Sequence, residues 1–72
     1  MNILEKITQH KLAFSKSERK VAEVILANPQ VAIHSSIATL AKMSDVSEPT
    51  VNRFCRRLDT KGYPDFKLHL AQ

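Results

Sequence analysis

Apolar residues recur along the first part of the chain at the spacing of an α-helix. Residues 2–11 carry a narrow apolar stripe for a first helix, formed by Ile3, Leu4 and Ile7. In residues 16–28 the apolar positions spread over about 200° of a helix at ~100° per residue. They are Val21, Ala22, Val24, Ile25 and Leu26. That arc is too wide for one contact face, so we expect the second helix to be the central element of the core.

Start and stop signals bound this second helix. Ser15 and Glu18 match the capping-box pattern, in which a Ser hydroxyl and a Glu three residues later satisfy free backbone N–H groups. Pro29 disfavours helical geometry in the residue before it. The helix should therefore begin near Lys16 and end by Asn28.

Two further serines mark the helices that follow. Ser36 suits the N-cap of a third helix over 37–43, whose inward residues are Ile37, Leu40 and Ala41. Ser47 suits the N-cap of a fourth helix, because an acidic residue and a proline occupy the next two positions, where both are favoured. This helix should continue to about Asp59 or Thr60, with Gly62 as its stop signal.

The last residues, DFKLHLAQ, have the pattern of a fifth helix that starts but meets no stop signal. We therefore expect the chain to be part of a longer protein. The sequence contains no internal repeat and no strand-like alternation. The predicted fold is an all-α bundle of five helices containing a helix-turn-helix with a homeodomain-like three-helix core.

Residues 37–56 carry the features of the helix-turn-helix itself. Ala41 lies where the third helix must approach the fourth closely, and a larger side chain would push the two apart. Asp45 occupies a turn position that usually needs positive φ, which Asp tolerates better than most residues. Val46 and Val51 then close the angle between the helices by apolar contact.

On a helical wheel the fourth helix separates apolar from basic positions. With Thr50 at 0° and ~100° per residue, the positions between roughly 40° and 140° are Val51, Phe54, Cys55 and Leu58. The positions between roughly 200° and 300° are Pro49, Asn52, Arg53 and Arg56, with Arg57 at the edge near 340°. The period of the helix therefore collects the arginines on its outer face.

The outer face has the chemistry to read a major groove. Arginine can pair bidentately with guanine, asparagine with adenine, and glutamate can accept from the cytosine amino group. Base contacts are accordingly predicted for Glu48, Pro49, Asn52, Arg53 and Arg56. Phosphate contacts, which suit hydroxyls near helix N-termini and cations beside the reading face, are predicted for Ser36, Ser47, Thr50, Arg57 and Lys61. The alternative is that Arg56 and Arg57 are solvated surface residues and that Glu48 only serves its helix dipole.

Composition narrows the class of protein. Seventy-two residues form one small domain, and a net charge of +4 favours an anionic partner such as nucleic acid or a membrane surface. The absence of Trp argues against a stacking platform for single-stranded nucleic acid. One cysteine excludes an internal disulfide, and neither a signal peptide nor an apolar run of about 18 residues is present. A soluble, cytoplasmic protein without a membrane partner is expected.

No enzyme, cofactor or metal site is expected. His10, His34 and His69 are widely separated, and Cys55 lies on the predicted inner face. No glycine-rich phosphate loop, metal-ligand spacing or Cys/His signature appears. A helical protein-interaction or dimerisation module remains the alternative to DNA binding, because the apolar faces of the first two helices could bind a partner helix.

Four motifs give the chain a family resemblance. They are S-x-x-T-V-x-R-F from Ser47, the pair Gly62-Tyr63, F-K at 66–67, and FSKSERKVAEVIL at 14–26. Together they make the whole chain, 1–72, similar to the N-terminal domain of RpiR-type bacterial transcription regulators. The resemblance implies binding of double-stranded DNA as a homodimer, and regulation, as a repressor, of genes for hexose metabolism. It also implies a phosphosugar effector that binds a following sugar isomerase (SIS) domain, none of which is present in these 72 residues.

Overall fold

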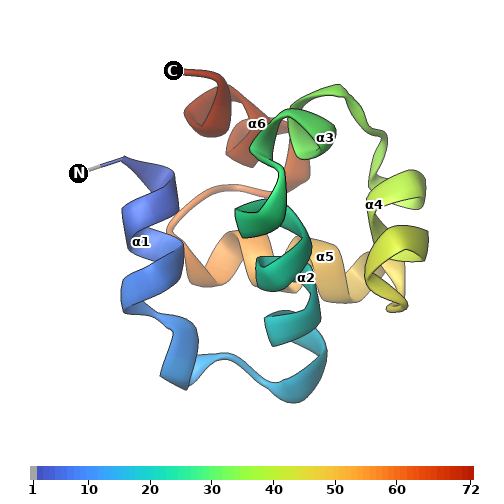
Figure 1. Ribbon diagram of the computed structural model, residues 1–72, viewed down its shortest axis with the longest axis horizontal. Coiled ribbons are helices and arrows are strands. Elements are labelled where there is room, and N and C mark those ends of the chain that lie inside the picture. The colour runs from blue at the N-terminus through green and yellow to red at the C-terminus, as the bar shows by residue number, and fades with distance from the viewer. Residues whose placement is uncertain (1) are drawn as a thin grey trace.

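The fold is built only of helices over the part of the chain that the structure describes. A computed structural model describes residues 2–72 and contains six α-helices and one 3-10 turn in that range (Figure 1). In chain order these are α1 (Ile3–Gln9), η1 (Lys11–Ala13), α2 (Lys16–Ala27), α3 (Pro29–His34), α4 (Ile37–Ser44), α5 (Glu48–Arg57) and α6 (Tyr63–Ala71). The all-α prediction is confirmed, whereas the expected number of five helices is one too few.

The additional helix, α3, begins at the same proline that ends α2. Asn28 leaves helical geometry with φ −155° and ψ 88°, and Pro29 then occupies the first turn of α3. Proline suits that position because its φ is already helical and its missing N–H would have no partner there. Pro29 therefore acts as a stop signal for one helix and a start signal for the next, and only the first effect was predicted.

The predicted capping box at the start of α2 is confirmed. The N–H of Glu18 donates to Ser15 Oγ (3.2 Å), and the N–H of Ser15 donates to Glu18 Oε1 (2.8 Å). Both hydrogen bonds satisfy N–H groups that have no partner within the helix. The start of α2 is thus fixed by two residues that the sequence pattern identifies.

The end of α5 differs from the prediction. Its last helical residue is Arg57, and Asp59 turns the chain with φ 65°. The N–H groups of Asp59 and the residue after it donate to carbonyls in the last turn of α5, at 3.1 and 3.3 Å, which is the pairing of a Schellman motif. Gly62 is therefore not the stop signal of α5. It precedes α6 instead, with φ 151° and ψ −170°.

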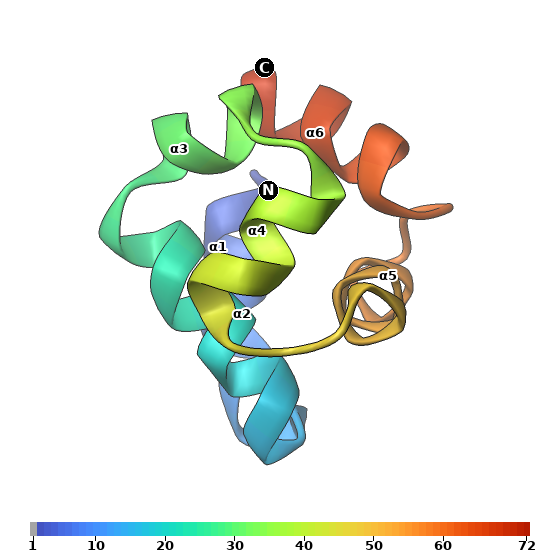
Figure 2. The same ribbon diagram turned by 90° about the vertical axis from the view of Figure 1, so that its right-hand side faces the viewer.

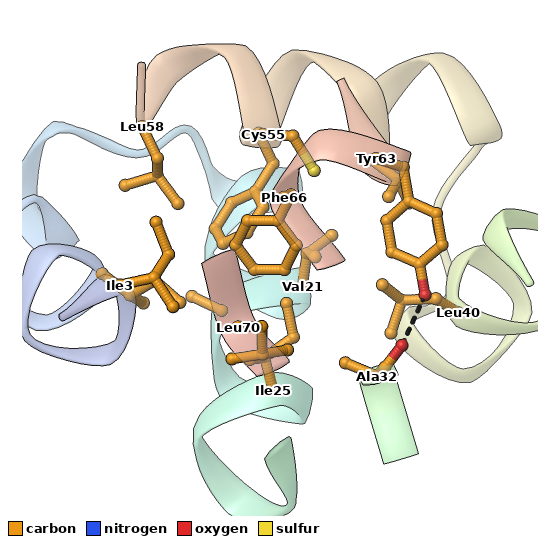
Figure 3. Packing of buried hydrophobic residues seen from close by; sticks show 14 of the residues in the cluster. Ile3, Val21, Ile25, Ala32, Leu40, Cys55, Leu58, Tyr63, Phe66 and Leu70 are labelled. Carbon is orange, nitrogen blue, oxygen red and sulfur yellow. Dashed lines mark hydrogen bonds between the residues drawn. The ribbon is translucent and has the colours of Figure 1, made fainter. Parts of the chain in front are cut away.

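α2 is the central element of the core, as its wide apolar arc predicts. It packs against α3, α4 and α5, and its inner residues Val21, Ala22 and Ile25 are fully buried. Figure 3 shows two of these side chains directed at Phe66 and Leu70 of α6. The core therefore joins the second helix to the last one across the whole domain.

Aromatic rings link α5 and α6 to the segment before α2. The ring centroid of Phe54 in α5 lies 5.0 Å from that of Phe14 and 5.8 Å from that of Phe66. Phe66 in turn lies 6.5 Å from Tyr63. Such pairs contribute about 0.5–1.5 kcal/mol each beyond the area that they bury. The inner face of α5 is thereby anchored from two sides.

The arrangement leaves the outer side of α5 open. Figure 2, which views α5 end-on, shows α4 beside it, the connecting turn at one end and α6 above. α2, α4 and α6 all contact α5, so packing takes up only part of its circumference. Within residues 2–72, no helix has the length and apolar character needed to cross a membrane.

Candidate nucleic-acid interface

The turn between α4 and α5 has the predicted geometry. Asp45 adopts a left-handed conformation with φ 57° and ψ 47°. The N–H of Asp45 donates to the carbonyl of Lys42 (3.1 Å), and the N–H of Val46 donates to the carbonyl of Ala41 (3.0 Å). Ala41 is buried, with 4% of its surface exposed. The prediction of positive φ at Asp45 is confirmed, and so is burial at Ala41.

The inner face of α5 contains the four residues that were predicted to be buried and, in addition, Thr50. Val51, Phe54, Cys55 and Leu58 are buried, and burial raises the pKa of the Cys55 thiol to about 12. Thr50 is buried as well, and its Oγ1 lies 2.9 Å from Ser47 Oγ. The Thr50 hydroxyl therefore has a hydrogen-bond partner within the protein, and its contact with a phosphate stays a prediction.

The five residues predicted to contact bases lie together. A single open hollow on the outer side of α5, here called the outer hollow, is lined by Glu48, Pro49, Asn52, Arg53 and Arg56. Arg53 and Arg56 are exposed, and neither takes part in an ion pair within the described residues. Both guanidinium groups are therefore available to an anionic or polar ligand in this hollow.

Arg57, in contrast, forms an ion pair within the protein. Its Nε lies 3.0 Å from Glu18 Oε1, and the Glu18 side chain is completely buried while that of Arg57 is 41% exposed. Burial raises the pKa of Glu18, but the hydrogen bond from the Ser15 N–H and the contact with Arg57 lower it by more, so this pKa lies below its ordinary value of 4.5. Arg57 is thus partly committed to a carboxylate of α2, which its place on the helical wheel does not reveal.

Asn52 is also engaged within the protein. Its Oδ1 accepts a hydrogen bond from the N–H of Tyr63, at 3.1 Å, and its side chain is half-buried between α5 and α6. A bidentate contact with adenine needs the amide oxygen as an acceptor and the amide nitrogen as a donor. While Oδ1 holds the start of α6, the nitrogen is the part of Asn52 that is left for a ligand.

The remaining residues predicted to contact phosphates do not line the outer hollow. Ser36 caps α4, where its Oγ accepts from the Thr39 N–H at 3.1 Å. Ser47 precedes α5 without a side-chain bond to a backbone N–H, and Lys61 is exposed just after α5. The three are exposed and come from three different connecting segments. The described residues contain no group of three or more His, Cys, Asp or Glu that could hold a metal ion.

Two residues that matter to the interface were missed by sequence reasoning. Glu18 was assigned only to its capping box, and Tyr63 only to a family motif. Each contacts a polar side chain of α5 from a different helix, Glu18 that of Arg57 and Tyr63 that of Asn52. Neither contact has a periodic signal, because it depends on how helices pack rather than on the pattern within one helix.

The fold and the site together define a class of protein. α2, α4 and α5 form a three-helix unit in which α4 and α5 are joined by a tight turn, and the exposed face of α5 is basic. That is the architecture of a helix-turn-helix domain, whose second motif helix enters the major groove of DNA. The sequence profile described as "Helix-turn-helix domain, rpiR family" matches residues 1–72. The chain belongs to the RpiR family.

Individual relatives agree with this assignment. The chain is 71% identical over 72 residues to the HTH-type transcriptional regulator HexR of Escherichia coli, covering 100% of this chain and 25% of that protein. It is 45% identical over 69 residues to the bifunctional protein glk of Burkholderia thailandensis, covering 96% of this chain and 11% of that protein. The chain therefore spans about a quarter or less of the length of these relatives.

Solved structures show the same fold. The N-terminal domain of ybbH from Bacillus subtilis superimposes with a TM-score of 0.91 at 36% identity, covering 96% of this chain and 84% of that chain. The Vibrio vulnificus NanR protein complexed with ManNAc-6P superimposes with a TM-score of 0.93 at 40% identity, covering 97% of this chain and 27% of that chain. The chain thus matches the N-terminal domain of ybbH and one part of the longer NanR chain.

Proposed function

We propose that these 72 residues read a specific sequence of double-stranded DNA. The observation that carries this proposal is the outer face of α5, where Arg53 and Arg56 are exposed beside a hollow and form no ion pair within residues 2–72, while the opposite face is buried. A guanidinium can recognise the O6 and N7 atoms of guanine in the major groove. Membership of a helix-turn-helix family supports the same proposal.

The contacts divide between bases and phosphates. Arg53 and Arg56 are proposed to read bases, with Glu48 and Pro49 beside them in the outer hollow and Asn52 adding at most a donor. None of the residues proposed to contact phosphates lines the outer hollow; they are Ser36, Ser47, Thr50, Arg57 and Lys61. Arg57 would use the part of its guanidinium that faces away from Glu18. Phosphate contacts set register, and base contacts set sequence preference.

The regulatory setting is proposed from the relatives. HexR is a transcriptional regulator, and NanR was solved with the phosphorylated sugar ManNAc-6P. This domain would accordingly serve a cytoplasmic repressor of hexose-metabolism genes that acts as a homodimer. A phosphosugar would bind a sugar isomerase domain beyond these 72 residues. The domain itself would not be an enzyme, even where it occurs in a bifunctional protein such as glk.

Selection from random duplex DNA tests the proposal directly. The domain should enrich one site, called here the selected duplex, and should bind it more tightly than a scrambled duplex of equal length and composition. With about 3–5 phosphates neutralised per monomer, log affinity should fall against log salt with a slope of roughly −3 to −5. Affinity that does not depend on salt, or enrichment of no site, would contradict the proposal.

A helical interaction or dimerisation module is the second candidate. It is favoured by Leu12, which is 95% exposed, by Leu68, which is 67% exposed, and by a hollow between α1 and α2 lined in part by Leu4 and Leu26. Sedimentation of the domain without DNA, combined with titration of the two duplexes, distinguishes the two candidates. A module of this kind should associate in the absence of DNA and show no preference between the selected and scrambled duplexes.

A further inference from the structure

The chain links the two helices of the helix-turn-helix directly at only one end of each helix. α4 and α5 are linked by the turn at Asp45 to Ser47, and Figure 2 shows this turn at the lower end of α4 and α6 above α5. The first residue of α4 and its N-cap Ser36 lie at the end of α4 that is farther from the turn. The distance between that end and the outer face of α5 is therefore not fixed by the turn alone.

Tyr63, the first residue of α6, connects α5 to the segment that precedes α4. Its backbone N–H donates to Asn52 Oδ1 on α5, at 3.1 Å. Its hydroxyl lies 2.7 Å from the carbonyl oxygen of Ser35 and 2.8 Å from that of Ala32, just before α4. The residue is 4% exposed, and Figure 3 shows its ring directed from α6 toward Ala32 and Leu40. One tyrosine thus spans from the reading helix to the residue that precedes the N-cap of α4.

Neighbouring contacts hold this tyrosine in place. Lys67 Nζ donates to the same Ser35 carbonyl at 3.2 Å and lies 5.3 Å from the centre of the Tyr63 ring. Gly62 turns the chain just before, in a conformation with φ 151° that side chains rarely adopt, and a Cβ on it would lie 3.4 Å from Asn52 Oδ1. The backbone that aims the Tyr63 N–H at Asn52 therefore requires a glycine.

We propose that Tyr63 is a positioning residue that fixes the spacing between the start of α4 and the base-reading face of α5. The inference rests on the proposed DNA-binding function. Specific binding needs the phosphate contacts at Ser36 and the base contacts of α5 in one register, whereas non-specific binding needs only phosphates. The contacts of Tyr63 with Asn52 and with the Ser35 carbonyl are here called the brace. Asn52 acts as part of this brace and does not read bases.

The experiment compares four variants of the 72-residue chain on the selected and scrambled duplexes. Tyr63→Phe removes only the hydroxyl, Asn52→Ala removes the acceptor on α5, and the double variant removes both. None of these changes the net charge, so the electrostatic attraction to DNA is preserved. Leu70→Val, at the far end of α6, is the matched control because it weakens the core without touching the brace. Melting temperatures are recorded for each, and binding is measured well below them.

Tyr63→Phe should weaken binding to the selected duplex about 5-fold, the size of one net hydrogen bond, and binding to the scrambled duplex less than about 2-fold. Asn52→Ala should give a similar loss of preference, and the double variant should lose little more, because both changes break one brace. Leu70→Val should keep the wild-type preference.

Three outcomes would overturn the inference. The first is a loss of preference in Leu70→Val equal to that in Tyr63→Phe, which would reflect stability alone. The second is a Tyr63→Phe variant that retains the full preference. The third is a double variant whose losses multiply, which would make Asn52 an independent reader of bases. Failure of the proposed function looks different, because the wild-type chain would then select no duplex, and both proposals would be wrong.

Discussion

The three arginines at the end of α5 have different surroundings, and their roles should differ for that reason. Arg53 and Arg56 are exposed one turn apart and line the outer hollow. Arg57 leans toward α2 and contacts the buried carboxylate of Glu18. A residue that is free at the centre of the face can meet base edges, whereas one held at its border can meet only the backbone of the duplex.

Alanine substitution should separate these roles. Arg53→Ala or Arg56→Ala should remove most of the preference for the selected duplex, since a bidentate base contact contributes about 1–3 kcal/mol of discrimination. Arg57→Ala should weaken binding to both duplexes by similar factors and make the salt slope shallower by about one unit. Titration of both duplexes at several salt concentrations measures the duplex preference and the salt slope of each variant. If Arg57→Ala abolished the preference while the other two variants kept it, the orientation assigned to α5 would be wrong.

Glu18 should make the stability of the domain depend on pH. Its pKa is lower in the folded state than its ordinary value of 4.5, so the unfolded chain binds the proton more readily. The stabilisation from this carboxylate is complete above pH 4.5 and is lost as the pH falls through the folded-state pKa. Glu18→Gln should therefore lower the free energy of unfolding at pH 7, and its difference from wild type should shrink below pH 4.5.

Urea denaturation at pH 3, 5 and 7 checks this expectation. Glu23→Gln, an exposed change in the same helix, is the control for general effects of charge. A gap between Glu18→Gln and wild type that stayed constant down to pH 3 would show that the charge of the Glu18 carboxylate does not contribute to stability.

At the scale of elements, the residues at the ends of the helices determine how α4, α5 and α6 are oriented around the site. α4 and α5 both end at an aspartate in the left-handed region, Asp45 with φ 57° and Asp59 with φ 65°. α6 begins after Gly62, whose φ of 151° and ψ of −170° lie in a region that is essentially accessible only to glycine. The angles between α4, α5 and α6 are therefore set at three single residues.

Gly62→Ala should destabilise the domain by about 1–3 kcal/mol, the cost of holding an ordinary residue in such a conformation. Asp45→Gly should be neutral or stabilising, because glycine adopts positive φ without penalty and the exposed contact of Asp45 with Lys20 contributes little. Chemical denaturation of both variants measures the difference. Equal stability of Gly62→Ala and wild type would mean that α6 can start without this conformation.

At the scale of the whole molecule, charge is not spread evenly between the hollows. The outer hollow contains two unpaired arginines. A second polar hollow, lined by Lys6, Thr60 and His69 among others, has its lysine neutralised by Asp59 at 3.1 Å. Of these two hollows, the outer one is thus the place where an anion meets arginines that form no ion pair within residues 2–72, and that place is proposed for DNA.

A phosphorylated sugar should therefore leave DNA binding by these 72 residues unchanged. ManNAc-6P, the ligand of the NanR complex, is a suitable probe, with inorganic phosphate at equal ionic strength as the control for salt. Fluorescence titration of the selected duplex and calorimetry on the free domain provide the two measurements. A saturable heat with the sugar phosphate but not with phosphate would show that this domain itself carries an effector site.

The sequence by itself determined five of the six helices and the outer face of this protein, but not α3 or the end of α5. Helical period, the capping box at Ser15 and the turn at Asp45 act between residues a few positions apart, so they can be read without knowing the fold. The same locality explains why all five residues predicted to contact bases share one hollow.

Only the tertiary structure decided how α5 is held. The contacts of Arg57 with Glu18, of Asn52 with Tyr63, and of Tyr63 with Ser35 join different helices. No repeat within a helix encodes them, since each depends on the distance and angle at which two helices pack. For the same reason Thr50 proved to be buried, although its position on the wheel lies at the border between the two faces.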